Sequence, residues 1–205
     1  MRYLFFISFL WLAFSCSTQQ KTTEQQESTR SKITAFQEKL VAEWNDPSTT
    51  PLKKDEKEDF QGIHFFPIDL SYVVPAQFKA IENGKTIPFP TSAQKIKYYK
   101  EYGSLHFKLN GQKYQLMVYQ SDPPIEGYED SLFLPFMDDT NGETSYGGGR
   151  YIDLSLSDIQ NNSLLLDFNQ AYNPYCAYSQ HYNCPIPPLN NFLDTAIEAG
   201  VSYQP

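Results

Sequence analysis

Positive charge is scarce in this sequence. Its 205 residues include 16 Lys and Arg against 24 Asp and Glu, which gives a formal net charge of -8. An acidic surface repels phosphate backbones, and no basic patch with interleaved aromatic residues is present. The composition therefore argues against a nucleic-acid-binding protein.

Several common enzyme signatures are absent as well. The sequence contains no P-loop, no dinucleotide-binding fingerprint, no zinc-protease helix motif and no internal repeat. We therefore predict no cofactor, and whether the protein is an enzyme stays open. Any activity has to be inferred from smaller groups of residues.

Long hydrophobic runs are missing except at the start of the chain. Residues 3–14 form an apolar run after Arg2 that is too short to span a bilayer, which is typical of a secretory signal. The run ends in Ser15 and Cys16, a pattern that resembles a bacterial lipobox. We predict a signal peptide over 1–15 and lipidation of Cys16, which would attach the protein to a membrane without spanning it. An uncleaved anchor and a cytoplasmic protein with an apolar start are the alternatives.

The next segment has no apolar side chain at all. Residues 17–31 cannot contribute to a core, so we predict that 16–31 are the lipidated cysteine and a disordered tether. No acidic pair follows Cys16 directly, which by resemblance to sorting signals favours the outer membrane, facing the periplasm. The remaining residues, 32–205, are enough for one domain with a sizeable core.

This domain begins with the pattern of a helix and continues with the pattern of strands. Apolar residues at Ile33, Phe36, Leu40, Val41 and Trp44 form the stripe of an amphipathic helix. After Gly62 the pattern has period two, and Asn-Gly turns are expected at 83–84, 110–111 and 141–142. Further strands are predicted at 63–68, 72–80, 131–136, 149–154 and 163–168. The predicted fold class is mainly β, an antiparallel hairpin-rich sandwich or partly closed barrel behind an N-terminal amphipathic helix.

The segment 138–154, DDTNGETSYGGGRYIDL, is the first candidate for function. Gly147, Gly148 and Gly149 precede Arg150 there. Backbone N–H groups of a glycine run and a guanidinium can together bind a carboxylate or a phosphate. The alternative is a glycine bulge in a hairpin, with Arg150 paired to a nearby aspartate at 138, 139 or 153.

The second candidate is the segment 164–178, LLLDFNQAYNPYCAY. After three leucines, Asp167 and Asn169 share one side of a strand, and Tyr172 and Asn173 follow where the strand breaks. A buried carboxylate needs a partner, and Arg150 is the partner that we propose for Asp167. These side chains form either a structural network or the floor of a pocket.

The third candidate is the segment 169–188, which contains Cys176, His181 and Cys184. In an exported protein, two cysteines eight positions apart favour a disulfide. A zinc site with these three residues, a catalytic Cys176 or Cys184 thiolate activated by His181, and free structural thiols are the alternatives. Because no fourth ligand is visible, we predict no metal.

The same segments carry a resemblance to a known family. The succession GIHFFPIDLSY (62–72), LFLPFMDDTNGETSYGGGRYIDL (132–154), LLLDFNQAYNPYCAYS (164–179) and HYNCPIPPLNNFLDTAIEAG (181–200) resembles the bacterial family called domain of unknown function 1684. The resemblance implies no established reaction. It implies that certain positions belong together, namely Tyr146, Gly147, Gly148, Gly149, Arg150, Tyr151, Asp153, Asp167, Asn169, Tyr172, Asn173, Cys176, Cys184 and Pro185.

These observations lead to one functional hypothesis and two alternatives. We predict a lipid-anchored envelope protein that binds a small polar or anionic ligand. The alternatives are a hydrolase that uses a Cys/His pair and a structural protein that binds an envelope partner. The predicted ligand-binding residues are Gly147, Gly148, Gly149, Arg150, Asp167, Asn169, Tyr172 and Asn173.

Overall fold

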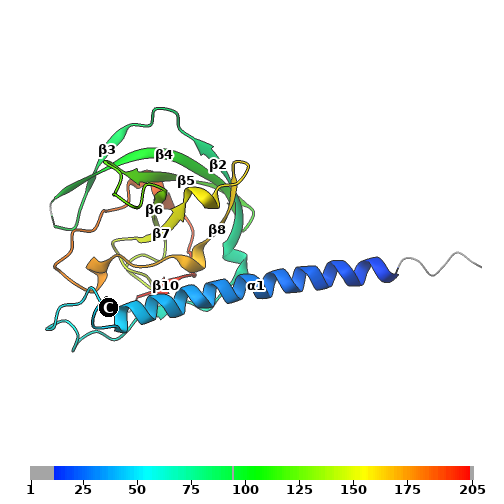
Figure 1. Ribbon diagram of the computed structural model, residues 1–205, viewed down its shortest axis with the longest axis horizontal. Coiled ribbons are helices and arrows are strands. Elements are labelled where there is room, and N and C mark those ends of the chain that lie inside the picture. The colour runs from blue at the N-terminus through cyan, green and yellow to red at the C-terminus, as the bar shows by residue number, and fades with distance from the viewer. Residues whose placement is uncertain (1–11, 94, 204–205) are drawn as a thin grey trace, which may run out of the picture.

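The computed structural model describes residues 12–93 and 95–203, which form one long helix and a curled antiparallel sheet. The helix α1 (Leu12–Asn45) runs along the base of the β structure, and its N-terminal half extends beyond it (Figure 1). No helix among these residues combines the length and hydropathy that a membrane span requires. Residues 1–11 of the predicted signal peptide lie outside the described residues.

The helix starts earlier than the sequence predicts. Residues 16–31 belong to α1 in the structure, where the sequence predicts an unstructured tether. Side chains from 22 to 31 are exposed except for the half-buried Thr29. Gln, Glu and Lys have good helix propensity, so a helix can continue through this segment without packing against a core.

The C-terminal half of α1 packs as predicted. Ile33 and Trp44 are buried, and Phe36, Leu40 and Val41 are half-buried against the β structure. The helix ends at Asn45, where Asp46 and Pro47 begin a turn. The predicted amphipathic stripe is therefore the face that holds α1 to the domain.

All of the strands lie after residue 62 in the described part of the chain. They are β1 (His64–Phe65), β2 (Val73–Ala80), β3 (Thr86–Pro90), β4 (Ile96–Leu109), β5 (Gln112–Ser121), β6 (Ser131–Asp138), β7 (Arg150–Ser155), β8 (Ser163–Asp167), β9 (Phe192–Leu193) and β10 (Val201–Ser202). Short 3-10 helices join them at η1 (Leu70–Tyr72), η2 (Leu156–Asp158), η3 (Phe168–Gln170), η4 (Tyr175–Ala177) and η5 (Leu189–Asn191).

The main sheet curls into a half-barrel. Its strand order is β7-β6-β5-β4-β2-β8, β3 pairs with β4, and β9 pairs with β6 in parallel; β1 and β10 form a separate pair. In Figure 1, β2, β3 and β4 arch over the side of the domain that lies opposite α1. The predicted fold class, mainly β with one N-terminal helix, is confirmed.

The three predicted Asn-Gly hairpins have different outcomes. Asn110 and Gly111 have φ values of 50° and 81° and join β4 to β5, so this two-residue hairpin is confirmed. The turn at 83–84 joins β2 to β3, which pair with β4 rather than with each other. The turn at 141–142 lies inside the longer connection 139–149 between β6 and β7. The last two predictions of tight hairpins are therefore wrong.

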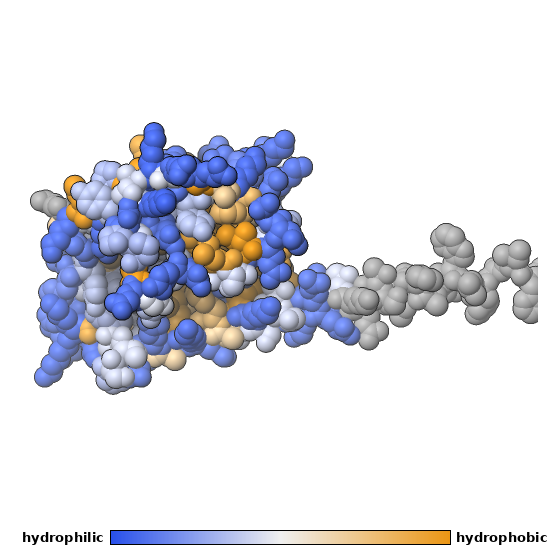
Figure 2. All heavy atoms as spheres, turned by 45° about the horizontal axis from the view of Figure 1, so that its top comes forward, coloured by the Kyte–Doolittle hydropathy of each residue, from blue (hydrophilic) through white to orange (hydrophobic). Residues whose placement is uncertain are grey.

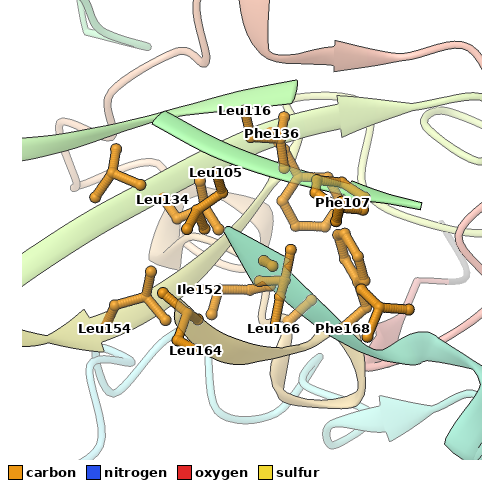
Figure 3. Packing of buried hydrophobic residues seen from close by; sticks show 14 of the residues in the cluster. Leu105, Phe107, Leu116, Leu134, Phe136, Ile152, Leu154, Leu164, Leu166 and Phe168 are labelled. Carbon is orange, nitrogen blue, oxygen red and sulfur yellow. The ribbon is translucent and has the colours of Figure 1, made fainter. Parts of the chain in front are cut away.

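The concave face of the sheet encloses the main core. Side chains from seven strands and from η3 meet there, and Figure 3 shows several of them pointing toward one another. Phe168 of η3 lies between two strand phenylalanines, with ring centroids 5.7 Å from Phe107 and 5.4 Å from Phe136. The face of the molecule in Figure 2 is mostly hydrophilic, with apolar atoms gathered near its middle.

The convex face carries a second cluster and a covering segment. Met117 and Tyr119 alternate with the core residues of β5 and pack with Phe89 on this opposite face. The segment after η3 crosses it: Tyr172 forms a backbone bridge with Tyr151, and the Asn191 side chain bonds to both N and O of Met117 and to O of Pro135. This segment contains most of the second and third candidate groups.

Candidate functional site

Arg150 is a structural residue in this fold and not an accessible ligand contact. Its side chain is 0% exposed, and its guanidinium donates to Asp138 Oδ2 at 2.7 Å and to the carbonyl oxygens of Ile197, Ala199 and Val201. The predicted pairing with Asp167 is wrong, whereas the alternative pairing with Asp138 is confirmed. Because every one of these partners is internal, Arg150 cannot bind a solvent-borne anion in this structure.

The glycine run before Arg150 serves a tight turn. The N–H of Gly149 donates to the carbonyl of Tyr146 at 3.1 Å, and Gly149 has a φ of +84°. A Cβ at Gly149 would lie 2.8 Å from the carbonyl oxygen of Phe136, so close packing as well as the backbone angle requires glycine here. The glycine-bulge alternative fits these observations better than an anion-binding loop.

Asp167 and Asn169 form a structural network. Asp167 caps η3 by accepting from Asn169 N at 2.9 Å and from Asn169 Nδ2 at 2.8 Å. Asn169 is 1% exposed and bonds to both backbone N and O of Asp69, each at 3.0 Å. The pair therefore ties η3 to the chain before η1 and does not line a pocket.

The two cysteines form a disulfide between Cys176 and Cys184. This agrees with the predicted staple and leaves neither sulfur as a thiolate, so it argues against the catalytic and zinc alternatives. His181 lies beside an acid, with its Nε2 3.6 Å from Glu56 Oε1. Among the described residues, no group of three or more His, Cys, Asp or Glu side chains is placed to hold a metal ion.

A wide, polar depression lies beside the disulfide. Its volume is about 1040 Å³, and its lining includes Asp55, Glu56, Asp59, His64, Tyr146 and His181. His64 and His181 are exposed, as are two of the three acids. These are ordinary solvated surface groups, and nothing in their hydrogen bonding indicates a ligand.

A smaller recess lies where α1 meets the convex side of the domain. Its volume is about 210 Å³. One wall comes from α1 and the other from β7, from β10 and from the segment around η4. Its lining residues are Phe36, Lys39, Leu40, Glu43, Trp44, Ile63, Asp153, Tyr172, Asn173, Tyr175, Tyr178 and Val201. The predicted residues Tyr172 and Asn173 thus meet in one place.

Asp153 is one of the two acidic residues that line this recess. On β7 it lies on the same side as Tyr151, away from the core residues Ile152 and Leu154. Its Oδ1 accepts a hydrogen bond from the Tyr172 hydroxyl at 2.9 Å, and its Oδ2 has no hydrogen-bond partner among residues 12–93 and 95–203. The side chain is exposed by surface area, and it lines the recess beside Tyr172 and Asn173.

The surroundings of Asp153 shift its pKa and the pKa values of nearby tyrosines. Desolvation raises the pKa of Asp153, although the Tyr172 hydrogen bond opposes the shift. Burial, together with the Asp153 carboxylate, raises the pKa of Tyr172 well above its usual value and that of Tyr99 to about 12. The recess therefore places a carboxylate with a raised pKa among neutral phenols.

Asn173 adds a second acceptor without a partner. It is 3% exposed, and its Nδ2 donates to the Tyr178 hydroxyl at 2.8 Å. Its Oδ1 is buried and accepts no hydrogen bond within the part of the chain that the structure describes. A buried acceptor of this kind costs free energy unless a donor is supplied.

A match to the family described as "Protein of unknown function (DUF1684)" spans residues 58–202. The chain belongs to this DUF1684 family. The match includes every strand of the half-barrel and the disulfide, whereas α1 lies outside it. The Lys39, Glu43 and Trp44 wall of the recess therefore comes from outside the matched segment.

This DUF1684 protein resembles a solved structure over most of its length. The solution NMR structure of the uncharacterized protein from gene locus rrnAC0354 of Haloarcula marismortui is 32% identical, with a TM-score of 0.69. The alignment covers 88% of this chain and 97% of that chain. No curated protein matches the sequence.

Sequence reasoning identified one side of the recess and missed the other. Asp153, Tyr172 and Asn173 are all among the positions that the family resemblance groups together. Trp44 was predicted only as part of the amphipathic stripe and Glu43 was not singled out, because nothing local shows where a helix will dock. The alternation in Tyr151-Ile152-Asp153-Leu154 was the available signal that Asp153 faces away from the core.

Proposed function

We propose that this protein binds a small polar ligand in the recess between α1 and β7. The observation that supports the proposal is the Asp153 carboxylate, which is recessed, bonded on one oxygen to Tyr172 and free of any cation within ion-pair distance among the described residues. Desolvation raises the pKa of this carboxyl, so a ligand that neutralises its charge would be favoured there.

The shape and composition of the recess support the same proposal. Aromatic side chains with a few polar groups are the usual lining of small-molecule sites. Trp44 packs edge-on against two of these rings, with centroid distances of 5.7 Å to Tyr175 and 4.7 Å to Tyr178. Rings that support one another in this way form a preorganised wall. At about 210 Å³, the recess suits a molecule of modest size.

Thermal denaturation in the presence of a metabolite panel tests the proposal. We expect at least one small polar compound to raise the melting temperature, because a ligand that binds only the folded state stabilises it. The variant Tyr172→Phe removes the hydroxyl that orients Asp153 and should reduce this shift. Glu126→Gln, an exposed acid outside the recess, is the matched control. Equal shifts in all three proteins would place the ligand elsewhere.

The attachment to the cell envelope is a separate proposal, which depends on the sequence before the domain. Cys16 follows the apolar run as in a lipobox, and acylation there would anchor the protein. We expect an alkyne-tagged fatty acid to label the protein in its host and the Cys16→Ser variant to remain unlabelled. Labelling that persists in Cys16→Ser would contradict the anchor.

A further inference from the structure

The recess carries uncompensated negative charge. Two acids, Asp153 and Glu43, and one base, Lys39, line it. The ion pairs found within the described residues join Arg150 to Asp138 and His181 to Glu56, so neither acid of the recess has a cation within contact distance. A bound anion would face this charge directly. The recess therefore favours a cationic or neutral ligand over the anionic one that the sequence suggested.

The aromatic lining favours a cation further. Trp44, Tyr172, Tyr175 and Tyr178 contribute rings to the recess. The faces of aromatic rings carry negative electrostatic potential, and a cation close to them is stabilised. The same rings give apolar contact to the carbon skeleton of an organic cation. A hydrated metal ion would gain little from such walls.

The hydrogen-bonding groups narrow the choice among organic cations. Asp153 Oδ2 and Asn173 Oδ1 have no hydrogen-bond partner among residues 12–93 and 95–203, and both are acceptors. Asn173 is one of the most buried polar residues of the domain. A primary ammonium has three N–H donors, whereas a quaternary ammonium has none and an alcohol has one. Of these three groups, only the primary ammonium combines a positive charge, which neutralises the Asp153 carboxylate, with several N–H donors for free acceptors.

We propose that the ligand is a primary amine, bound as its ammonium ion by Asp153 and Asn173, with its carbon skeleton against Trp44 and the tyrosine rings. The inference rests on the proposed function, because it specifies the chemistry of the ligand in the same recess. Glu43 adds to the negative potential, and the Tyr172 hydroxyl holds the Asp153 carboxylate in place by its bond to Oδ1.

A series of four matched probes separates this inference from the proposed function. Butylamine, trimethylbutylammonium, 1-butanol and butyrate differ in charge and donors on the same carbon chain. Trp11 lies in the predicted signal peptide, so a protein that begins at Cys16 keeps Trp44 as its single tryptophan and its fluorescence reports on the recess. We expect butylamine to bind about tenfold more tightly than each other probe, the size of effect that one charged hydrogen bond produces.

The possible results of this probe series distinguish the primary-amine inference from the proposed function. If 1-butanol, butyrate or trimethylbutylammonium binds as tightly as butylamine, the recess binds ligands but the primary-amine inference is overturned. If none of the four probes changes the fluorescence of Trp44, both the primary-amine inference and the proposed function are overturned. Asp153→Asn should weaken butylamine about tenfold and leave 1-butanol unchanged, while Glu126→Gln should change neither. Unchanged butylamine affinity in Asp153→Asn also overturns the inference, and the probe series on the parent protein decides the matter if that variant does not fold.

Discussion

The guanidinium of Arg150 is enclosed on all sides by protein. It bonds to Asp138 and to three backbone carbonyls of the segment 197–201, and it lies 5.7 Å from the ring centroid of Phe66 and 5.4 Å from that of Phe136. Asp138 in turn accepts from Thr140 and from the backbone N–H of Ile197. One ion pair thus joins the ends of β6 and β7 to the C-terminal segment.

We predict that Arg150→Met lowers the free energy of unfolding by about 3–5 kcal/mol, because it leaves the Asp138 charge buried without its cation. Chemical denaturation measures the loss. The double variant Arg150→Met/Asp138→Asn removes both charges, so it should lose less than the sum of the two single variants. Additive losses would show that the pair does not act as a unit.

Asp153 should lower the stability of the fold near neutral pH, whereas Arg150 raises it. Its pKa is raised in the folded protein, so the folded state favours the protonated carboxyl and is stabilised relative to the unfolded state at low pH. This stabilisation is lost as the pH rises through the raised pKa. Asp153→Asn, which cannot ionise, should therefore be more stable than the parent protein at pH 7.5 and equal to it near pH 4.

The expected gain is below about 1 kcal/mol, because the side chain is partly exposed and solvent screens its charge. Melting temperatures of Asp153→Asn and of the parent protein, measured across this pH range, test the sign. The Glu126→Gln control should show no pH-dependent difference. A gain that persists unchanged at pH 4 would mean that Asp153 does not titrate with a raised pKa.

At the scale of elements, the segment 172–192 lines the recess and covers the convex face of the sheet rather than joining the main core. It crosses the convex face, binds the sheet through Tyr172 and Asn191, and carries the disulfide within the loop that holds Tyr175 and Tyr178. Because it contains only short 3-10 turns, few backbone bonds would otherwise restrict it. The disulfide is therefore expected to limit the freedom of this loop mainly in the unfolded chain.

We predict that replacing both Cys176 and Cys184 by Ser lowers the free energy of unfolding by about 2–3 kcal/mol, as the chain-entropy relation gives for a loop of this length. For a domain of this size the melting temperature should fall by about 5–10 °C. Treatment of the parent protein with a reducing agent should produce the same fall, and Cys16→Ser should not. A double variant as stable as the parent would show that the cysteines do not act as a staple.

Local sequence patterns predicted elements better than their pairing. The stripe from Ile33 to Trp44, the hairpin at 110–111 and the strands around 72–80, 131–136 and 149–154 are all present. These depend on interactions between residues close in the chain. The pairing of β2 with β4 and with β8 was not predictable, because it depends on contacts between segments far apart in the sequence.

The residues of the candidate site were likewise predicted where the signal is local and misassigned where it depends on global packing. Tyr172 and Asn173 were predicted from the break after a buried strand, and they do line the recess. Arg150 was misassigned because an arginine beside glycines has the same local pattern whether it faces solvent or a buried carboxylate. Only the position of the C-terminal segment, which comes from global packing, distinguishes the two cases.

At the scale of the whole molecule, the two ends of the domain meet. β10 near the C-terminus pairs with β1 at the start of the β region, and Ile197, Ala199 and Val201 are buried. Ile197 and Ala199 belong to the main core, and their carbonyls bind Arg150. Residues 196–203 therefore complete the core instead of covering it, so the half-barrel is expected to fold as one cooperative unit with its C-terminal segment.

We predict that ending the chain after Thr195 abolishes the cooperative thermal transition, because it removes Ile197 and Ala199 from the core and three carbonyls from Arg150. Near-ultraviolet circular dichroism, which reports fixed packing of the many aromatic residues, should be lost, and far-ultraviolet signal should be reduced. A chain that ends after Tyr203 keeps β10 and every one of these contacts, so it should melt like the parent protein. If the shorter chain still unfolded cooperatively with native near-ultraviolet signal, the sheet would be stable by itself, and the Arg150 contacts would be a consequence of the fold rather than a condition for it.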